Sequence, residues 1–150
     1  MVIRAGMFTI EGKDKKGRPV LWYRPELLKG SETVINKNKL KQLNIFYIEK
    51  LDKQYPNEGW DLAIDCSKVT KENIDMEFYL FLTKVYMVYY PRTVKYIFAM
   101  YVPPVISDVP KTIMDLMGEE FRSRHKFPKY KELTDNYIDA NNVPSYVTQI

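Results

Sequence analysis

Two side chains in this sequence are of types that act as a base or a nucleophile in enzymes. His125 is the only histidine, and the basic residues around it disfavour its imidazolium form. A catalytic histidine needs a partner, so we interpret His125 as a surface residue on a basic strand. Cys66 is the only cysteine, which excludes an internal disulfide and suits a reducing compartment. It ends an apolar run, where a thiol normally packs as a small hydrophobic group.

Two carboxylates are also spaced so that they could work together. Asp61 and Asp65 are four residues apart in a predicted strand over residues 60–66, so they share a face. We expect Asp65 to cap the following turn or to pair with a lysine, rather than to form a carboxylate dyad. The sequence has no glycine-rich phosphate loop, no GxSxG and no HExxH. It therefore predicts a protein that is not an enzyme; the alternative, a small hydrolase, needs a nucleophile–base pair that the sequence does not show.

The elements that would position these residues alternate between strands and helices. Turn chemistry and alternating apolar residues predict a hairpin over residues 7–23. Apolar periodicity predicts further strands over 60–66, 94–102 and 121–127, and helices over 33–55, 75–89, 105–117 and 129–137. Strands that alternate with helices in this way indicate an α/β fold with a mainly parallel sheet and flanking helices. The length of 150 residues is that of one domain, which we place at residues 1–150.

Composition limits the partners that we expect. The net charge is +4, and the densest basic run lies in the predicted hairpin turn at residues 13–18, where charge is commonly only solvated. No nucleic-acid-binding motif accompanies it, so we expect no nucleic-acid partner. No segment approaches the ~18 apolar residues of a membrane span. We therefore expect a cytoplasmic protein whose contact with membranes, if any, is peripheral.

The predicted helix over residues 105–117 is apolar and follows Pro103 and Pro104. Two prolines separate it mechanically from the preceding strand, because neither continues a ladder of backbone hydrogen bonds. A hinged apolar helix of this kind is suited to cover a hydrophobic cavity, so we expect a gate helix here. The aromatic content of 14% also suits an apolar cavity wall with a few hydroxyl groups.

Four segments in order resemble the CRAL-TRIO lipid-binding domain family: GKDKKGRPVLWYRP, AIDCSKV, YYPRTVKYIFAMYVPPVI and YIDANNVPSYV. Residues 12–19 look like the family's G-x-D-x-x-G-R-P hairpin, and Asp65 matches the aspartate that ends its second strand. Tyr90 and Pro91 match its Y/F-P, and Pro103 matches the proline of its N-x-P. The segment NIDMEFYLFLTKVYMVYYPRT is most similar to the CRAL-TRIO domain of motile-sperm-domain-containing proteins, which are anchored at the endoplasmic reticulum.

The sequence departs from the family pattern in three places. Tyr101 replaces the asparagine of N-x-P, the glycine pair after the closing segment is absent, and the N-terminal helical bundle is absent. These departures leave open an alternative function, a protein-interaction or membrane-tethering module whose cavity is closed.

The resemblance implies a sheet as the cavity floor, helices as its walls and the gate helix as its cover. It implies non-enzymatic binding and intermembrane transfer of a phospholipid or similar ligand, with no other cofactor. Its expected partners are this lipid, an anionic membrane surface, for instance at the endoplasmic reticulum, and flanking domains in a longer protein. The lipid-binding residues that it implies are Leu62, Ile64, Leu82, Val85, Tyr86, Ile97, Ala99, Ile106, Ile113 and Met117. The headgroup- or membrane-binding residues are Arg92, Lys95, Arg122 and Arg124.

Overall fold

The hairpin predicted near the N-terminus is present and forms one edge of the sheet. The computed structural model describes residues 6–27, 37–73, 76–116 and 118–150. In this part of the chain, β1 (Phe8–Lys13) pairs antiparallel with β2 (Pro19–Tyr23). Then β3 (Trp60–Asp65), β4 (Val94–Met100) and β5 (His125–Lys126) continue the sheet in parallel, in the order β1-β2-β3-β4-β5. The expected mainly parallel α/β fold is confirmed.

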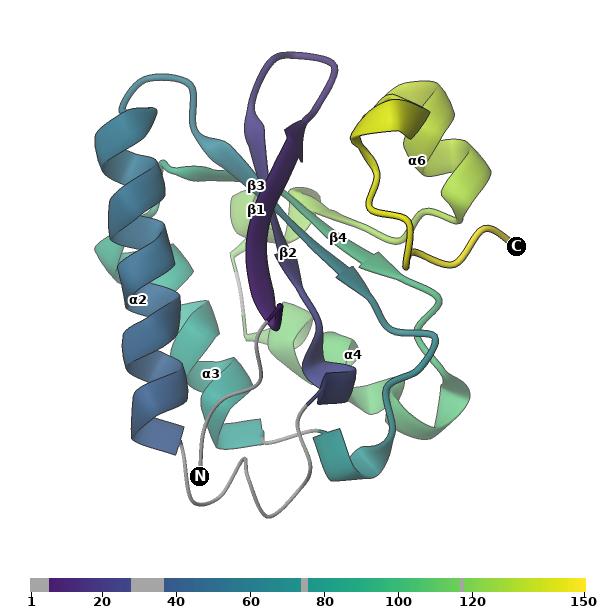
Figure 1. Cartoon of the computed structure of the whole chain (residues 1–150). Helices are drawn as coiled ribbons and strands as arrows, with labels where there is room; N and C mark the ends of the chain where they lie inside the picture. The colour runs from purple at the N-terminus through teal and green to yellow at the C-terminus, as the bar shows by residue number, and fades with distance from the viewer. Residues whose placement is uncertain (1–5, 28–36, 74–75, 117) are drawn as a thin grey trace.

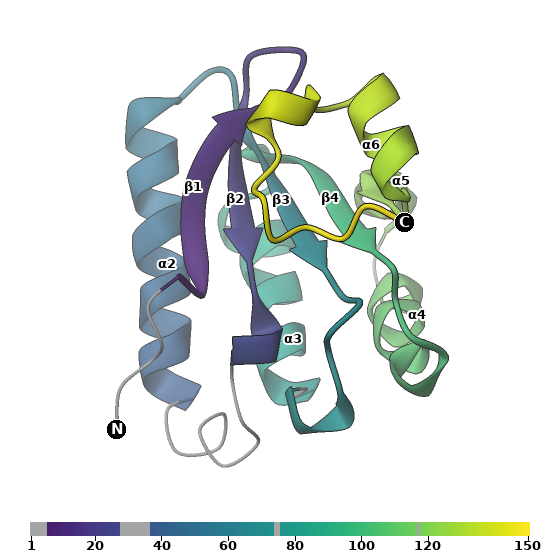
Figure 2. The same cartoon turned by 45° about the vertical axis from the view of Figure 1, so that its right-hand side comes forward.

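Helices cover both faces of this sheet (Figure 1). On one face lie α2 (Lys37–Gln54) and α3 (Met76–Lys84), and α3 continues as a π-helix, η3 (Val85–Tyr89). On the other face lies α6 (Tyr130–Asn136), and the C-terminal segment runs across the strands beside it (Figure 2). At the end of the sheet formed by β4 and β5 lie α4 (Asp108–Asp115) and α5 (Glu119–Ser123). The short 3-10 turns are η1 (Pro25–Leu27), η2 (Lys71–Asn73), η4 (Pro104–Ile106) and η5 (Ala140–Asn142).

Each face of the sheet has its own apolar core, because successive strand residues point to opposite sides. On the α2–α3 side, Trp60 and Leu62 of β3 pack with Tyr86 and the helices. On the α6 side, Ala63 packs with Phe98. A parallel strand that is buried on both faces is expected to be mostly apolar, which explains the nearly continuous apolar run of β4.

Gly59 allows β3 to begin directly against β4. Its φ is +76°, and an added Cβ atom would lie 2.7 Å from the Thr93 carbonyl oxygen. The next residue, Trp60, donates its backbone N–H to this same carbonyl over 2.9 Å. A residue without a side chain is required here, because both the left-handed backbone and the close approach exclude a Cβ atom.

The structure corrects the strand predicted over residues 121–127. Residues 119–123 form α5 instead, and only His125 and Lys126 pair with β4. Two glutamates in the first turn of α5 stabilise the helix start, and Phe121 points into the core. In so short a segment, alternating apolar and basic residues fit a helical turn as well as a strand, so periodicity alone could not decide.

The predicted helices are present, with different bounds. The helix predicted over 33–55 is α2, and residues 33–36 lie outside the described residues. Residue 75 of the helix predicted over 75–89 and residue 117 of the helix predicted over 105–117 also lie outside them. The 75–89 helix ends as a π-helix, in which Tyr90 N donates to Val85 O. The 105–117 helix is divided into η4 and α4, and we call residues 104–115 the gate segment.

Candidate functional site

An apolar cavity lies between the sheet and the helices α3 and α4. Its volume is about 100 Å³. Its floor consists of two pairs of residues that are in register on neighbouring strands, Leu62 with Ile97 and Ile64 with Ala99. The wall is formed by α3 and η3, and the gate segment covers it. The residues from these helical elements are Tyr79, Leu82, Thr83, Tyr86, Ile106 and Ile113, and the remaining lining residues are Pro25, Cys66, Val69, Val102, Phe121 and His125.

Eight of the ten residues implied to bind lipid line this cavity: Leu62, Ile64, Leu82, Tyr86, Ile97, Ala99, Ile106 and Ile113. Val85 packs in the neighbouring core and does not line the cavity. Met117 lies outside the described residues. Their role as lipid contacts stays a prediction, but the structure brings together side chains from four separate stretches of sequence.

His125 corrects the expectation of a surface histidine. It lines the cavity and is partly buried. Its backbone is paired with Ile97, and residues in register on adjacent strands point to the same face. Because β5 is only two residues long, its alternation was too short to show from sequence which residue faces inward.

The polar groups of the cavity wall are mostly engaged within the protein. Thr83 Oγ1 donates to Tyr79 O over 2.9 Å, and Asn44 Nδ2 of α2 donates to the Tyr86 hydroxyl over 3.4 Å. Burial raises the pKa of the Tyr86 hydroxyl, so it stays protonated. Burial, and then the charge of Asp65, raises the pKa of the Cys66 thiol to about 12. Cys66 is therefore a packing residue, as predicted, and not a thiolate nucleophile.

The gate segment begins after an unusual turn at Tyr101. Its φ is 54°, a left-handed conformation that asparagine adopts more readily than tyrosine. The Tyr101 side chain has contacts of its own. Its hydroxyl accepts a hydrogen bond from Tyr130 N and donates one to Ile150 O, both over 2.8 Å. Beyond the turn, Ile106 packs against Cys66 and Val69, which closes the cavity on this side.

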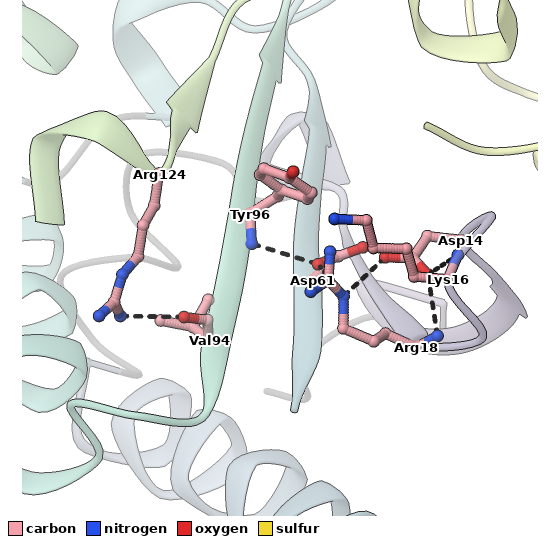
Figure 3. A network of polar contacts seen from close by, with 7 residues as sticks. All are labelled: Asp14, Lys16, Arg18, Asp61, Val94, Tyr96 and Arg124. Atoms are coloured by element: carbon pink, nitrogen blue, oxygen red, sulfur yellow. Dashed lines mark hydrogen bonds and ion pairs between the residues drawn. The ribbon is translucent and has the colours of Figure 1, made fainter. Parts of the chain in front are cut away.

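The four basic residues implied to bind a headgroup are not brought together. Arg92 and Arg124 line one cleft of about 320 Å³, and Arg122 lines another of about 370 Å³. The side chain of Lys95 lies over Gly59. The guanidinium of Arg124 is already engaged, since it donates to Pro91 O over 2.9 Å, to Val94 O over 3.0 Å (Figure 3) and to the Glu120 carboxylate over 2.8 Å.

A buried polar network on the other side of the sheet was not foreseen (Figure 3). Arg18 was expected to be solvated, but it is largely buried, and its Nε lies 2.8 Å from Asp14 Oδ2 and 3.6 Å from Asp61 Oδ1. Asp61 Oδ1 also accepts the backbone N–H of Tyr96 over 3.1 Å. The basic residue thus joins the hairpin turn to β3, and Asp61 pairs with Arg18 rather than with Asp65.

Asp65 has the capping role that was expected for it. Its Oδ1 accepts the backbone N–H of Ser67 over 3.0 Å, and its Oδ2 accepts that of Thr148 over 2.9 Å. One carboxylate therefore fixes both the turn after β3 and the C-terminal segment.

The described residues also limit what the site can bind and how the chain can meet a membrane. They contain no group of three or more His, Cys, Asp or Glu side chains that could hold a metal ion. None of the described helices is both long and apolar enough to cross a membrane.

The sheet, its two helical layers and the cavity between sheet and helices define an α/β protein with an apolar pocket. The model of the CRAL/TRIO domain family matches residues 3–148, and the chain belongs to this lipid-binding family. The crystal structure of Sfh5 has the same fold, with a TM-score of 0.69 and 18% sequence identity. The match covers 90% of this chain and 53% of Sfh5, so this chain spans about half the length of that one.

Proposed function

We propose that this protein binds a phospholipid or a similar hydrophobic ligand in the cavity and carries it between membranes, without catalysis. The cavity is the observation that carries this proposal. Its floor and walls are apolar, and part of its lining belongs to a segment that follows a proline pair. Transfer of a chain into such a lining contributes ~0.8 kcal/mol per methylene, so ten methylenes contribute about 8 kcal/mol before ordering costs.

The cavity volume requires that the protein opens to admit a lipid. At about 100 Å³, it is smaller than the ~150 Å³ cavity that accommodates benzene in an engineered protein. The gate segment is the element that moves in this proposal, because it contributes Ile106 and Ile113 to the lining and joins β4 through Tyr101 and the prolines. Its displacement would join the cavity to the surface.

The surface of this region supports contact with a membrane during exchange. Val105 near the start of the gate segment and Leu116 directly after it are 58% and 61% exposed. Lys111 of α4 and Arg122 line the neighbouring cleft together with Phe127, which is 49% exposed. Exposed apolar side chains beside cations are the combination that binds the interface of an anionic membrane.

The test is lipid capture and transfer by a cavity-filling variant. Native mass spectrometry and lipid extraction would identify the bound ligand, and transfer of a fluorescent phospholipid between vesicles would measure exchange. Ala99→Phe places a ring in the cavity and is expected to abolish both. The matched control is Ala140→Phe, the same change at an exposed position of η5. A wild-type protein that takes up no lipid from mixed vesicles would contradict the proposal.

The small cavity volume also keeps one alternative in view, a protein-interaction or tethering module with a permanently closed cavity. In that case the gate segment stays packed and no lipid is bound. Ala99→Phe would then change the free energy of unfolding and leave partner binding by the folded protein unchanged. The likeness to motile-sperm-domain-containing proteins, the location at the endoplasmic reticulum and the flanking domains stay predictions.

A further inference from the structure

His125 is the residue of the cavity wall that the proposed function does not yet use. It is opposite Ile97 in the sheet, and Ile97 is part of the cavity floor. The adjacent Lys126 is opposite Phe98 and points to the other face, where its Nζ lies 6.0 Å from the centre of the Tyr96 ring. The imidazole is therefore directed to the lipid side of the sheet.

The hydrogen bond of the ring fixes its tautomer. Nδ1 lies 3.2 Å from the carbonyl oxygen of Phe121. A carbonyl oxygen only accepts, so Nδ1 must carry the proton. Burial lowers the pKa of His125 and the charge of Arg124 adds to this, against the opposing effect of the Phe121 hydrogen bond, so the ring is neutral at neutral pH. In a neutral imidazole with a protonated Nδ1, Nε2 is an acceptor.

Nε2 of His125 has no hydrogen-bond partner among the described residues. The hydrogen bond that these residues make to the ring is the one between Nδ1 and the Phe121 carbonyl oxygen. The imidazole ring packs in an edge-to-face arrangement with the Phe121 ring, with 5.6 Å between the ring centres. Of the other polar groups in the wall, the Thr83 hydroxyl donates to a backbone carbonyl and the Tyr86 oxygen accepts from Asn44. A ligand that leaves Nε2 unpaired in an apolar pocket loses a hydrogen bond, which disfavours that ligand.

We propose that Nε2 of His125 accepts a hydrogen bond from a hydroxyl group of the bound lipid, so that the pocket favours lipids with a free hydroxyl group over analogues of the same chain that lack it. This proposal rests on the proposed function, because it requires that a lipid enters the cavity. It adds the chemical class of the ligand. The selection follows the rule that a site built to pair a hydroxyl rejects the analogue that lacks it.

The first test is nitrogen-15 NMR of the imidazole, which is free of overlap because the chain has one histidine. The lipid-free protein at neutral pH is expected to show a protonated Nδ1 and an unprotonated Nε2. Addition of hexadecanol is expected to shift the Nε2 resonance, whereas hexadecyl methyl ether is not. A protonated Nε2 in the neutral ring, or an imidazolium at neutral pH, would overturn the proposal.

The second test is a comparison of affinities for the same two probes. The wild type is expected to prefer hexadecanol by about five- to tenfold, the equivalent of one hydrogen bond. His125→Phe keeps a ring but removes both nitrogens, and is expected to bind the two probes equally. The control is Lys126→Gln, which changes the adjacent residue on the opposite face and is expected to keep the preference.

The outcomes separate the two proposals. Equal affinity of the wild type for alcohol and ether overturns the role of His125 and leaves lipid binding intact. Binding of neither probe and of no phospholipid overturns both. If His125→Phe does not fold, the NMR measurement on the wild type decides.

Discussion

Arg18 of the hairpin lies against Asp61 of β3, with 3.6 Å between Nε and Oδ1. The carboxyl group of Asp61 has no exposure to solvent, and Asp14 approaches the same guanidinium. The Arg18 guanidinium also lies 4.9 Å from the centre of the Tyr96 ring. The hairpin turn is therefore attached to the middle of the sheet by one cation that is shared between two carboxyl groups.

Loss of this cation is expected to destabilise the fold. Arg18→Met keeps much of the side-chain length but leaves the buried Asp14 carboxylate without a counter-charge and removes the guanidinium beside the Asp61 carboxyl group, which is expected to lower the free energy of unfolding by about 3 kcal/mol. Urea denaturation at neutral pH measures this change. Lys16→Met is the control, since Lys16 is an exposed residue of the same turn and is expected to change the stability little. Equal effects of the two substitutions would show that the pairing contributes nothing.

Asp61 is expected to give the stability an unusual pH dependence. Burial, and then the hydrogen bond and charge of Asp14, raises the pKa of Asp61 from 3.8 to about 9. The folded state therefore binds this proton more tightly than the unfolded state. The contribution of Asp61 is fully present below the unfolded pKa of about 4 and is lost as the pH rises towards 9, so the free energy of unfolding falls across this window.

Asp61→Asn removes this titration and keeps an oxygen that can accept the N–H of Tyr96. The stability of the variant relative to wild type is expected to increase steadily from pH 4 to about pH 9. Denaturation series at several pH values measure the two curves. Asp14 contributes with the opposite sign: burial would raise its pKa, but the bonds to Asp61 and Arg18 outweigh this and lower it. If the free energy of unfolding of wild type and of Asp61→Asn depends on pH in the same way, the raised pKa of Asp61 is contradicted.

The basic residues near the clefts are expected to differ in role. Arg92 is exposed, so Arg92→Gln is expected to leave stability unchanged and to weaken binding to anionic vesicles about fivefold, the equivalent of ~1 kcal/mol for one cation near the surface. Arg124→Gln is expected to lower the free energy of unfolding by about 2 kcal/mol, because Arg124 donates to two backbone carbonyls. Vesicle co-sedimentation and thermal denaturation separate these effects. A larger stability loss for Arg92→Gln than for Arg124→Gln would reverse the assignment.

Much of the fold could be predicted because its signals are local. The turn between β1 and β2, the apolar patterns of β3 and β4 and the break at Pro103 each arise from neighbouring residues. Residues 121–127 could not be assigned by the same means, since a short alternating segment fits two periodicities. The π-helical end of α3 was also missed, because residues 85–89 (VYMVY) are all apolar or aromatic and carry no periodicity in which an insertion would be visible.

Some residues of the candidate site could also be predicted from the sequence, and others could not. The family resemblance implied that Leu62, Ile64, Ile97 and Ala99 face the cavity, and in the structure they line it. Phe121 and His125 were not predicted to line it, because α5 and β5 are both too short to carry a pattern. Arg18 was expected to be solvated, because no local signal indicates that a charge in a turn will meet a carboxyl group on another strand.

The sequence by itself determined the order of the elements, the strand faces that are buried and the membership of the family, because periodicity, turn chemistry and motif order are properties of the linear chain. Only the tertiary structure decided the volume of the cavity, the inward position of His125, the pairing of Arg18 with Asp61 and the separation of the basic residues. These depend on distances between segments that are remote in sequence, and such distances are set by packing and strand register rather than by residue type.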